Sequence, residues 1–227
     1  MNACASLRTL VAPLLMVLAL LGSPLQPAHA GSAPDVVRLT VVAGQDVQFT
    51  ALTGEAGLPS GNVYGMAQDP QGFLWFATGD GLSRYDGYSL RTFRFDRDNA
   101  NSLAHNTVVS ILPGRNGVLW LGTTGGGVDR FDPVTETFTH HRHNPSSPTS
   151  LSSNSISRKG LLEDPQGVLW VGTNDSGLNR IDLLTGAVTY FRHDPKNANS
   201  LSSNNLESIY QDSERTLWIG TADAGLN

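Results

Sequence analysis

The sequence predicts an all-β protein, namely a β-propeller of four-stranded antiparallel blades, of which about three and a half are present as an open arc. The first observation is internal repetition: Trp75, Trp120, Trp170 and Trp218 recur roughly every 45 to 50 residues in nearly the same context. The second is the spacing of turn residues, because Gly, Pro, Asn and Asp interrupt the chain about every eight to twelve residues. No stretch beyond residue 30 has the apolar spacing of a long helix, so helical repeats of similar length are disfavoured.

The first 30 residues have the features of a secretory signal. Arg8 supplies a short basic start, residues 10–22 are apolar, and Ala28-His29-Ala30 is a small-x-small cleavage site. The apolar run is about 13 residues, well short of the roughly 20 that a permanent membrane span requires. We therefore expect an exported product that begins at Gly31, with an uncleaved N-terminal anchor as the alternative.

Composition excludes several classes of site. The only cysteine, Cys4, lies inside the signal, so the exported chain has no thiol for a disulfide, a thiolate metal site or a cysteine nucleophile. The whole chain has 15 Lys and Arg against 20 Asp and Glu, a net charge of −5, and no basic stripe. We therefore expect no nucleic-acid partner.

The repeats divide the chain into segments. Residues 31–56 form a leader in which residues 47–52 are a candidate partner strand, and residues 57–227 form the partial propeller. Its units are predicted at residues 57–101, 102–149, 150–199 and 200–227, the last of them truncated. The truncation is predicted because the final residues, 225–227, match the start of the third strand in the earlier units. An incomplete arc would leave unpaired strand edges and apolar faces, so we expect it to associate or aggregate.

Each unit contains four short β-rich stretches. The run around each tryptophan is continuously apolar, as a strand buried on both faces requires, and another apolar run precedes it at residues 63–67, 108–112 and 206–210. A third strand follows the glycines Gly81, Gly127 and Gly177, and a fourth is expected at residues 92–95, 137–141 and 187–191.

The turn that joins the first two strands has explicit chemistry. Units one and three have Asp, Pro and Gly in the positions that a type I turn favours. Unit two has Gly114 instead of the Asp, and unit four has Arg215 instead of the Gly, so we expect the fourth turn to be looser. The turns run over residues 69–72, 114–117, 164–167 and 212–215.

Three motifs recur together: Leu-Trp-x-Gly-Thr, then Gly-Leu-x-Arg-Phe-Asp, then Asn-Ser-Leu-Ser-x-Asn before the next unit. This pattern resembles the two-component regulator propeller family over residues 57–227. The departures are Phe76-Ala77 in unit one and the two extra residues Lys159-Gly160 in unit three.

The resemblance implies a periplasmic sensor region on the outer side of the bacterial inner membrane. In this family a β-sandwich, a membrane helix and a cytoplasmic histidine kinase, or less often a diguanylate cyclase, follow the propellers. Its expected partners are the remaining blades and signalling domains of the same protein, with a homodimer for the full-length receptor. No kinase or cyclase motif occurs in this chain, so we expect no catalytic residue and no cofactor here.

Strand alternation predicts where a ligand would bind. Connections between strands two and three, and between strand four and the next blade, share one face, which we call the loop face; its long polar segments offer directional hydrogen-bonding groups. We expect a small polar ligand there, with a glycan as one candidate. The predicted ligand-binding residues are Asp80, His105, Asn106, Thr124, Asn154, Asn174, Asp175, Asn204 and Asn205.

Other clusters favour structural roles. A metal site is a weaker interpretation of the histidines than packing or surface polarity, because aligned positions alternate with aromatic residues. The glycine run at residues 125–127 has no following helix to hold a phosphate, and the Asp and Asn cluster at residues 96–101 lacks the glycine and glutamate of a calcium loop. The recurrent arginines favour a blade-to-blade structural feature over a substrate clamp. The histidines are His140, His141, His143 and His193, and the arginines are Arg84, Arg130 and Arg180.

A second function class stays open at this stage. Similar blade motifs occur in exported propeller lyases. An enzyme acting on a polysaccharide or an antibiotic lactone, or a glycan-binding protein, is therefore the alternative to a ligand sensor. The sequence that continues the gene would distinguish them.

Overall fold

The computed structural model describes residues 51–52 and 57–227. The predicted signal at residues 1–30 lies outside the described residues. So does the leader, except for Ala51 and Leu52, which are not in a strand. Within the described residues no helix is long and apolar enough to cross a bilayer.

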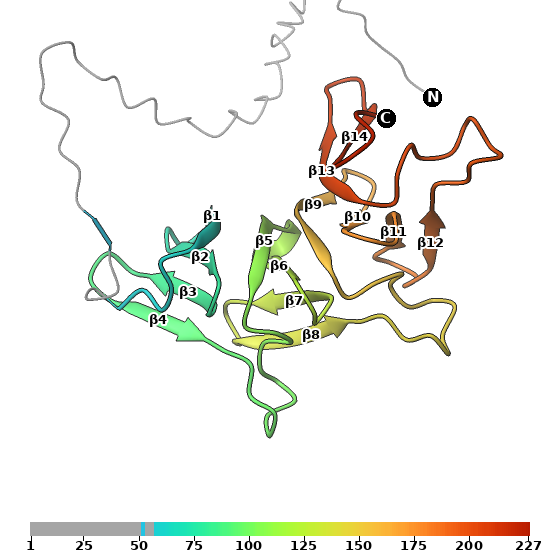
Figure 1. Ribbon diagram of the computed structural model, residues 1–227. Coiled ribbons are helices and arrows are strands. Elements are labelled where there is room, and N and C mark those ends of the chain that lie inside the picture. Colours follow the sequence, from blue (N-terminus) through green and yellow to red (C-terminus); the bar gives the residue numbers. More distant parts are fainter. Residues whose placement is uncertain (1–50, 53–56) are drawn as a thin grey trace, which may run out of the picture. The chain divides into compact units, whose positions relative to one another are not determined.

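The described residues form fourteen short strands and one 3-10 turn, η2 (Arg115–Gly117), in three complete blades and one half blade (Figure 1). Blade 1 comprises β1 (Val63–Gln68), β2 (Leu74–Thr78), β3 (Gly81–Tyr85) and β4 (Leu90–Phe93). Blade 2 comprises β5 (Val108–Pro113), β6 (Leu119–Thr123), β7 (Val128–Asp132) and β8 (Thr137–His141). Blade 3 comprises β9 (Ile156–Glu163), β10 (Val168–Thr173), β11 (Leu178–Asp182) and β12 (Val188–Phe191), and blade 4 has β13 (Leu206–Gln211) and β14 (Leu217–Thr221). The predicted all-β propeller, incomplete in its fourth blade, is confirmed.

Each blade is an antiparallel meander whose first strand lies innermost. The first strands β1, β5, β9 and β13 contact one another in succession, and Figure 1 shows the fourth strands β4, β8 and β12 on the outside. In each complete blade the tryptophan pairs with an arginine on the third strand, as in the pair Trp75 and Arg84. A single bridge between Gly220 and Leu226 begins the corresponding pairing in blade 4.

The cores lie between blades rather than within them. Trp75 and Leu82 of blade 1 pack against Leu121, Phe131 and Phe138 of blade 2. The opposite face of blade 2, which carries Trp120, packs against blade 3, and blade 3 packs against blade 4, through two further apolar clusters. Because apolar burial is the main favourable term in folding, each blade depends on its neighbours for stability.

The first strand carries a bulge in every blade, and blade 3 differs from the others. In β1, β5 and β13 the register shifts by one residue, whereas in β9 the pairing runs from Ile156 directly to Leu161. The two extra residues of unit three are therefore absorbed in this bulge, where Lys159 forms a bridge to Ser208 of β13. This bridge joins blades 3 and 4 into one six-stranded sheet.

The tight turns explain why Asp recurs before each tryptophan. In blade 1 the Asp69 carboxylate accepts hydrogen bonds from the backbone N–H groups of Gln71 and Phe73, and from the indole N–H of Trp75 at 2.7 Å. Asp164 and Asp212 bind the indoles of Trp170 and Trp218 in the same way, at 3.1 and 2.8 Å. A buried indole N–H needs such a partner, so this carboxylate is a structural part of the repeat.

In blade 2 the hydrogen-bond acceptor for the indole N–H comes from the next blade. Gly114 replaces the Asp, and the indole of Trp120 donates to Glu163 of blade 3 at 2.9 Å. A side chain at position 114 would collide with this pair, because an added Cβ would lie 2.7 Å from the Trp120 indole nitrogen and 2.9 Å from the Glu163 carboxylate. Glycine is thus required at position 114 because the hydrogen bond between Trp120 and Glu163 leaves no room for a side chain.

Two details differ from expectation. The fourth turn is not looser, because Arg215 donates its N–H to the Asp212 carbonyl at 3.1 Å as Gly72 does to Asp69 at 3.0 Å. Arg215 achieves this with φ 69°, a conformation unfavourable for a residue with a side chain. The fourth strand of blade 1 begins at Leu90 rather than Thr92, because Phe93 pairs with Leu82 and packs against Phe131 at 5.2 Å.

Candidate functional site

The loop face is held in shape by a threonine that recurs at the end of each second strand. The Thr123 hydroxyl donates to the Gly127 carbonyl at 3.0 Å and accepts the N–H of Gly126 at 2.8 Å. Thr78, Thr173 and Thr221 do the same in the other blades. The short loops between second and third strands are therefore rigid supports for the residues at their tips.

Three of the predicted ligand residues are structural asparagines. The side-chain oxygens of Asn106, Asn154 and Asn204 each accept a backbone N–H just beyond the fourth strand of the preceding blade, at 2.7 to 2.8 Å. Their backbone carbonyls also accept the N–H of the glycine that begins the third strand. Each asparagine thus uses its side chain and its backbone carbonyl to hold the end of the interblade connection against the preceding blade.

Two further predicted residues, His105 and Thr124, lie together on blade 2. The Nδ1 atom of His105 accepts the N–H of Thr107 at 3.0 Å and lies 3.4 Å from the Thr124 hydroxyl. The histidine ring also covers Gly125, where an added Cβ would lie 3.2 Å from it. These residues form a small local cluster at the start of β5.

Asp80 and Asn174 are likewise engaged within the protein. Asp80 forms an ion pair with Arg94 at 3.2 Å. The amide of Asn174 donates to the Ser155 hydroxyl at 2.9 Å and to the Ile156 carbonyl at 3.3 Å. Their position on the loop face is as predicted, but their polar groups already have partners.

The remaining predicted residues, Asp175 and Asn205, line a shallow hollow of about 510 Å³ together with Asn204. This hollow lies between two loops, the one that follows β10 in blade 3 and the one that follows β14 in blade 4. The connection between these blades forms its remaining side. Its other lining residues were not predicted as ligand residues: His193, Ser202, Ser203, Asp223 and Ala224. The sequence of residues 194–205 is polar, but only the structure brings Asp223 of blade 4 and Asp175 of blade 3 to the same hollow.

Hydrogen bonds fix part of this hollow. The His193 Nδ1 atom bonds to the Leu201 carbonyl at 2.7 Å, so its Nε2 atom is the one left to meet a ligand. The hydroxyl of Ser202 accepts from Asn227 at 2.9 Å, and that of Ser203 accepts the N–H of Asn205 at 3.0 Å. Asp175 and Asp223 are exposed, and neither carboxylate forms an ion pair within the described residues.

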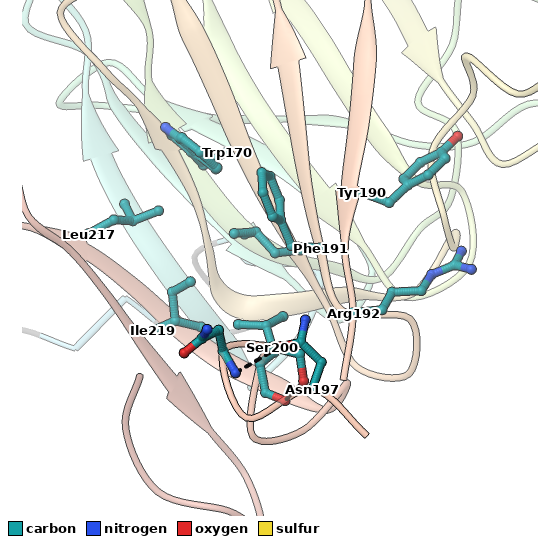
Figure 2. A pocket seen from close by; sticks show the side chains of 11 residues that line it. Trp170, Tyr190, Phe191, Arg192, Asn197, Ser200, Leu217 and Ile219 are labelled. Carbon is teal, nitrogen blue, oxygen red and sulfur yellow. Dashed lines mark hydrogen bonds between the residues drawn. The ribbon is translucent and has the colours of Figure 1, made fainter. Parts of the chain in front are cut away.

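A second hollow of about 420 Å³ lies between blades 3 and 4 and has a different character (Figure 2). Trp170, Phe191, Leu217 and Ile219 form its apolar lining. Between blades 1 and 2 the equivalent space is filled by Phe131 and Phe138, from the third and fourth strands of blade 2. By analogy with that space, this apolar hollow corresponds to a packing surface between blades rather than to a ligand site.

The histidines of the outer strands have protein partners. His140 bonds through Nδ1 to the buried Asp129 carboxylate at 2.6 Å and through Nε2 to the Ala100 carbonyl at 3.1 Å. The bond to Asp129 raises the pKa of His140, whereas burial lowers the pKa of His141, which packs beside Trp120. His143 bonds to the Leu151 carbonyl at 2.6 Å. Within residues 57–227, no group of three or more His, Cys, Asp or Glu side chains is placed to hold a metal ion.

The comparisons with known proteins agree with this architecture. The two-component regulator propeller family matches residues 57–80, 102–125, 150–175 and 200–223, one segment in each blade. No curated protein matches the sequence.

Solved structures similar to this chain include extracellular domains of bacterial signalling systems. The extracellular domain of the hybrid two-component system BT3049 of B. thetaiotaomicron is 28% identical, with a TM-score of 0.70 over 78% of this chain and 24% of that one. One structure of the extracellular domain of BT4673 of the same organism is 27% identical, with a TM-score of 0.60 over 75% and 21% of the two chains. Another, at 23% identity and a TM-score of 0.58 over 71% and 22%, shows the shared fold. The chain thus spans about a quarter of the length of these proteins.

Proposed function

Since its four repeats belong to the two-component regulator propeller family, we propose that the chain is part of the ligand-sensing region of a membrane signalling receptor. The region is exported to the periplasm, and ligand binding there is passed to a cytoplasmic histidine kinase or, less commonly, a diguanylate cyclase in the same receptor. The support is the similarity to the extracellular domain of a hybrid two-component system. This chain contributes binding rather than catalysis, and the receptor acts as a homodimer.

We place the sensing surface on the loop face, at the hollow between the loop that follows β10 and the loop that follows β14. The observation that carries this choice is a contrast between side chains that bind the backbone and side chains that stay exposed. Thr173 and Asn204 recur in other blades and their side-chain oxygens are engaged by the backbone, as are those of their equivalents. Asp175 and Asp223 occupy the same loop-tip position of blades 3 and 4, which Asp80 occupies in blade 1. Asp80 is paired with Arg94, whereas the carboxylates of Asp175 and Asp223 stay exposed and form no ion pair within the described residues.

The chemistry of this hollow suits a neutral ligand rich in hydroxyl groups. Two exposed carboxylates accept hydrogen bonds, and the serine hydroxyls can both donate and accept. The Nδ1–H of His193 donates to the Leu201 carbonyl, which leaves Nε2 of the neutral ring as an acceptor. No Lys or Arg lines the hollow, so an anionic ligand would meet two like charges without compensation. A neutral oligosaccharide fits these requirements.

Thermal unfolding of the chain with a panel of neutral oligosaccharides tests the proposal. A ligand that binds the folded state should raise the Tm, and the rise should grow with the ligand concentration above Kd. The double variant Asp175→Ala with Asp223→Ala should lose this rise while keeping the Tm of the free protein. The matched control is Gln71→Ala with Gln166→Ala, two exposed residues of the tight turns, and it should keep the rise. A response lost in the control and kept in the aspartate variant would place the site on the opposite face.

A further inference from the structure

The arginines that pair with the tryptophans lie in equivalent grooves between successive blades. Arg84 on β3 faces blade 2, and Arg130 on β7 faces blade 3, because each shares the face of a tryptophan that packs on the next blade. The turn between the third and fourth strands of the next blade closes each groove from the outside. The two grooves therefore offer an internal comparison of the same position.

Between blades 1 and 2 the protein supplies its own carboxylate to the arginine. Glu136, in the turn between β7 and β8, forms a two-pronged ion pair with Arg91 at 2.5 and 2.6 Å and lies 3.7 Å from Arg84. The Arg84 guanidinium also stacks on Phe73 at 4.9 Å and on Trp75 at 5.8 Å. This arginine is thus fully engaged, and the prediction of a blade-to-blade role holds for it.

The conformation of Glu136 shows that this arrangement has a cost. Glu136 has φ 54°, in the left-handed region that favours glycine. A glutamate nevertheless occupies this position, because its ion pairs with Arg84 and Arg91 offset the unfavourable backbone conformation. In blade 3 the equivalent position, just before the fourth strand, is Gly186 at φ 73°.

The groove between blades 2 and 3 therefore lacks the internal carboxylate. Arg130 is half buried, and it forms no ion pair, side-chain hydrogen bond or cation–π contact within the described residues. A hollow of about 680 Å³ opens beside it, lined on one side by Thr139 and His141 and on the other by Leu183 and Leu184. This is a larger space than the one of about 270 Å³ at the tight turns between blades 1 and 2.

The other charged groups of this hollow are already paired. Glu163 accepts the Trp120 indole N–H and the backbone N–H of Arg115, and forms an ion pair with the Arg115 side chain at 3.7 Å. Asp182 accepts the N–H groups of Leu184 and Thr185 at 3.1 and 2.8 Å, which close its own turn. Arg130 is therefore the cation of this hollow that forms no ion pair within the described residues. Asp132, two residues along β7, attracts it at longer range, but that carboxylate accepts the N–H groups of Val134 and Thr135.

We propose that the hollow between blades 2 and 3 binds a small carboxylate, which takes the place that Glu136 holds between blades 1 and 2. A guanidinium offers paired N–H donors whose geometry matches a carboxylate, and a half-buried arginine gains most from such a partner. Bound there, the carboxylate contacts Arg130 of blade 2 and the turn of blade 3, and so joins the two blades. This site is separate from the loop-face hollow and does not rest on the sensing proposal.

Titration of the 227-residue chain with carboxylates and their isosteric amides tests this site. The probes are benzoate against benzamide and acetate against acetamide, at constant ionic strength, followed by the NMR signals of the arginine side-chain N–H groups. We expect at least one carboxylate to shift the Arg130 signal with saturation by about 10 mM, whereas the amides leave it in place.

Three variants locate the site. Arg130→Gln should weaken carboxylate binding about tenfold or more, and Gly186→Glu should do the same because its own carboxylate would occupy the hollow. Arg84→Gln changes the equivalent arginine of the neighbouring groove and should leave binding unchanged. Because Gly186→Glu acts from blade 3, it keeps the test valid if Arg130→Gln does not fold. The proposal is wrong if no carboxylate shifts the Arg130 signal, if amides bind equally well, or if Gly186→Glu binds as the native chain does.

Discussion

Blades 1 and 4 are made from the same repeat, but their equivalent faces are buried very differently. Blade 2 covers this face of blade 1, whereas the face of blade 4 is largely exposed. Trp75 is 0% exposed, whereas Trp218 is 42% exposed because no described residue packs over it. Their indole N–H groups nevertheless bind their turn aspartates at nearly equal distances, 2.7 and 2.8 Å. The comparison shows that hydrogen bonding within a blade is set by the repeat itself, whereas burial is contributed by the next blade.

The largest expected effect comes from removing these two tryptophans. Trp75→Ala should lower the free energy of unfolding by about 3 to 5 kcal/mol, as for a fully buried aromatic side chain. Trp218→Ala removes the same hydrogen bond but less buried area, so about 1 to 2 kcal/mol is expected. Urea unfolding measures both, and equal losses would contradict the view that the neighbouring blade supplies the burial.

A smaller effect is expected from the interblade asparagines. Asn154→Ala leaves the N–H of His143 without its partner and should cost about 1 to 2 kcal/mol. Asn205→Ala is the control, because only its backbone groups are hydrogen bonded within the described residues, and a change within about 0.5 kcal/mol is expected. A loss as large for Asn205 as for Asn154 would remove the distinction between structural and ligand-facing asparagines.

The adjacent histidines of blade 2 should give opposite pH dependences. The pKa of His140 is raised by its bond to Asp129, so its stabilising contribution is present below the unfolded-state pKa of about 6.5 and is lost as the pH rises through the higher folded value. His140→Gln should therefore destabilise the chain more at about pH 5.5 than at about pH 8.5.

His141 provides the contrast. Burial lowers the pKa of His141, so its contribution is present above the unfolded-state pKa and is lost as the pH falls through the folded value. His141→Gln should flatten the loss of stability in acid. Tm values across the pH range check both variants, and parallel profiles for the two would show that Asp129 does not control His140.

The smallest effect concerns the fourth tight turn. Arg215 has φ 69° where blades 1 and 3 have glycine at φ 93° and 82°. Arg215→Gly should raise the stability of the β13–β14 hairpin by up to about 1 kcal/mol by removing this strain. Urea unfolding that showed a loss instead would mean that Arg215 makes a compensating contact.

Much of the fold follows from the sequence because each strand has a local signal. The apolar runs around Trp75, Trp120 and Trp170 predict second strands, and the Asp-Pro-Gln-Gly turns predict the hairpins before them. The start of β4 was misplaced because residues 90–95 are β-forming throughout. Only the packing of Phe93 between Trp75 and Phe131 selects the register.

The candidate site was harder to predict, for a physical reason. Asn106, Asn154 and Asn204 have the side-chain chemistry of ligand-binding residues, but the same oxygens that could bind a ligand bind the backbone. Their recurrence at the same position of units two, three and four was the available signal of a structural role. Asp223 and His193 could not be paired with Asp175 from sequence, because their proximity depends on how blade 4 packs beside blade 3.

Native-state hydrogen exchange tests the central claim, that neighbouring blades supply one another's stability, most directly. The account predicts that amides of the second strands β2, β6 and β10, which are covered by the following blade, exchange through one common opening at the free energy of global unfolding. Amides of β13 and β14 should exchange through a local opening at a clearly lower free energy, because the outer face of blade 4 is uncovered. Equal protection of β14 and β2, or a separate opening energy for every blade, would contradict it.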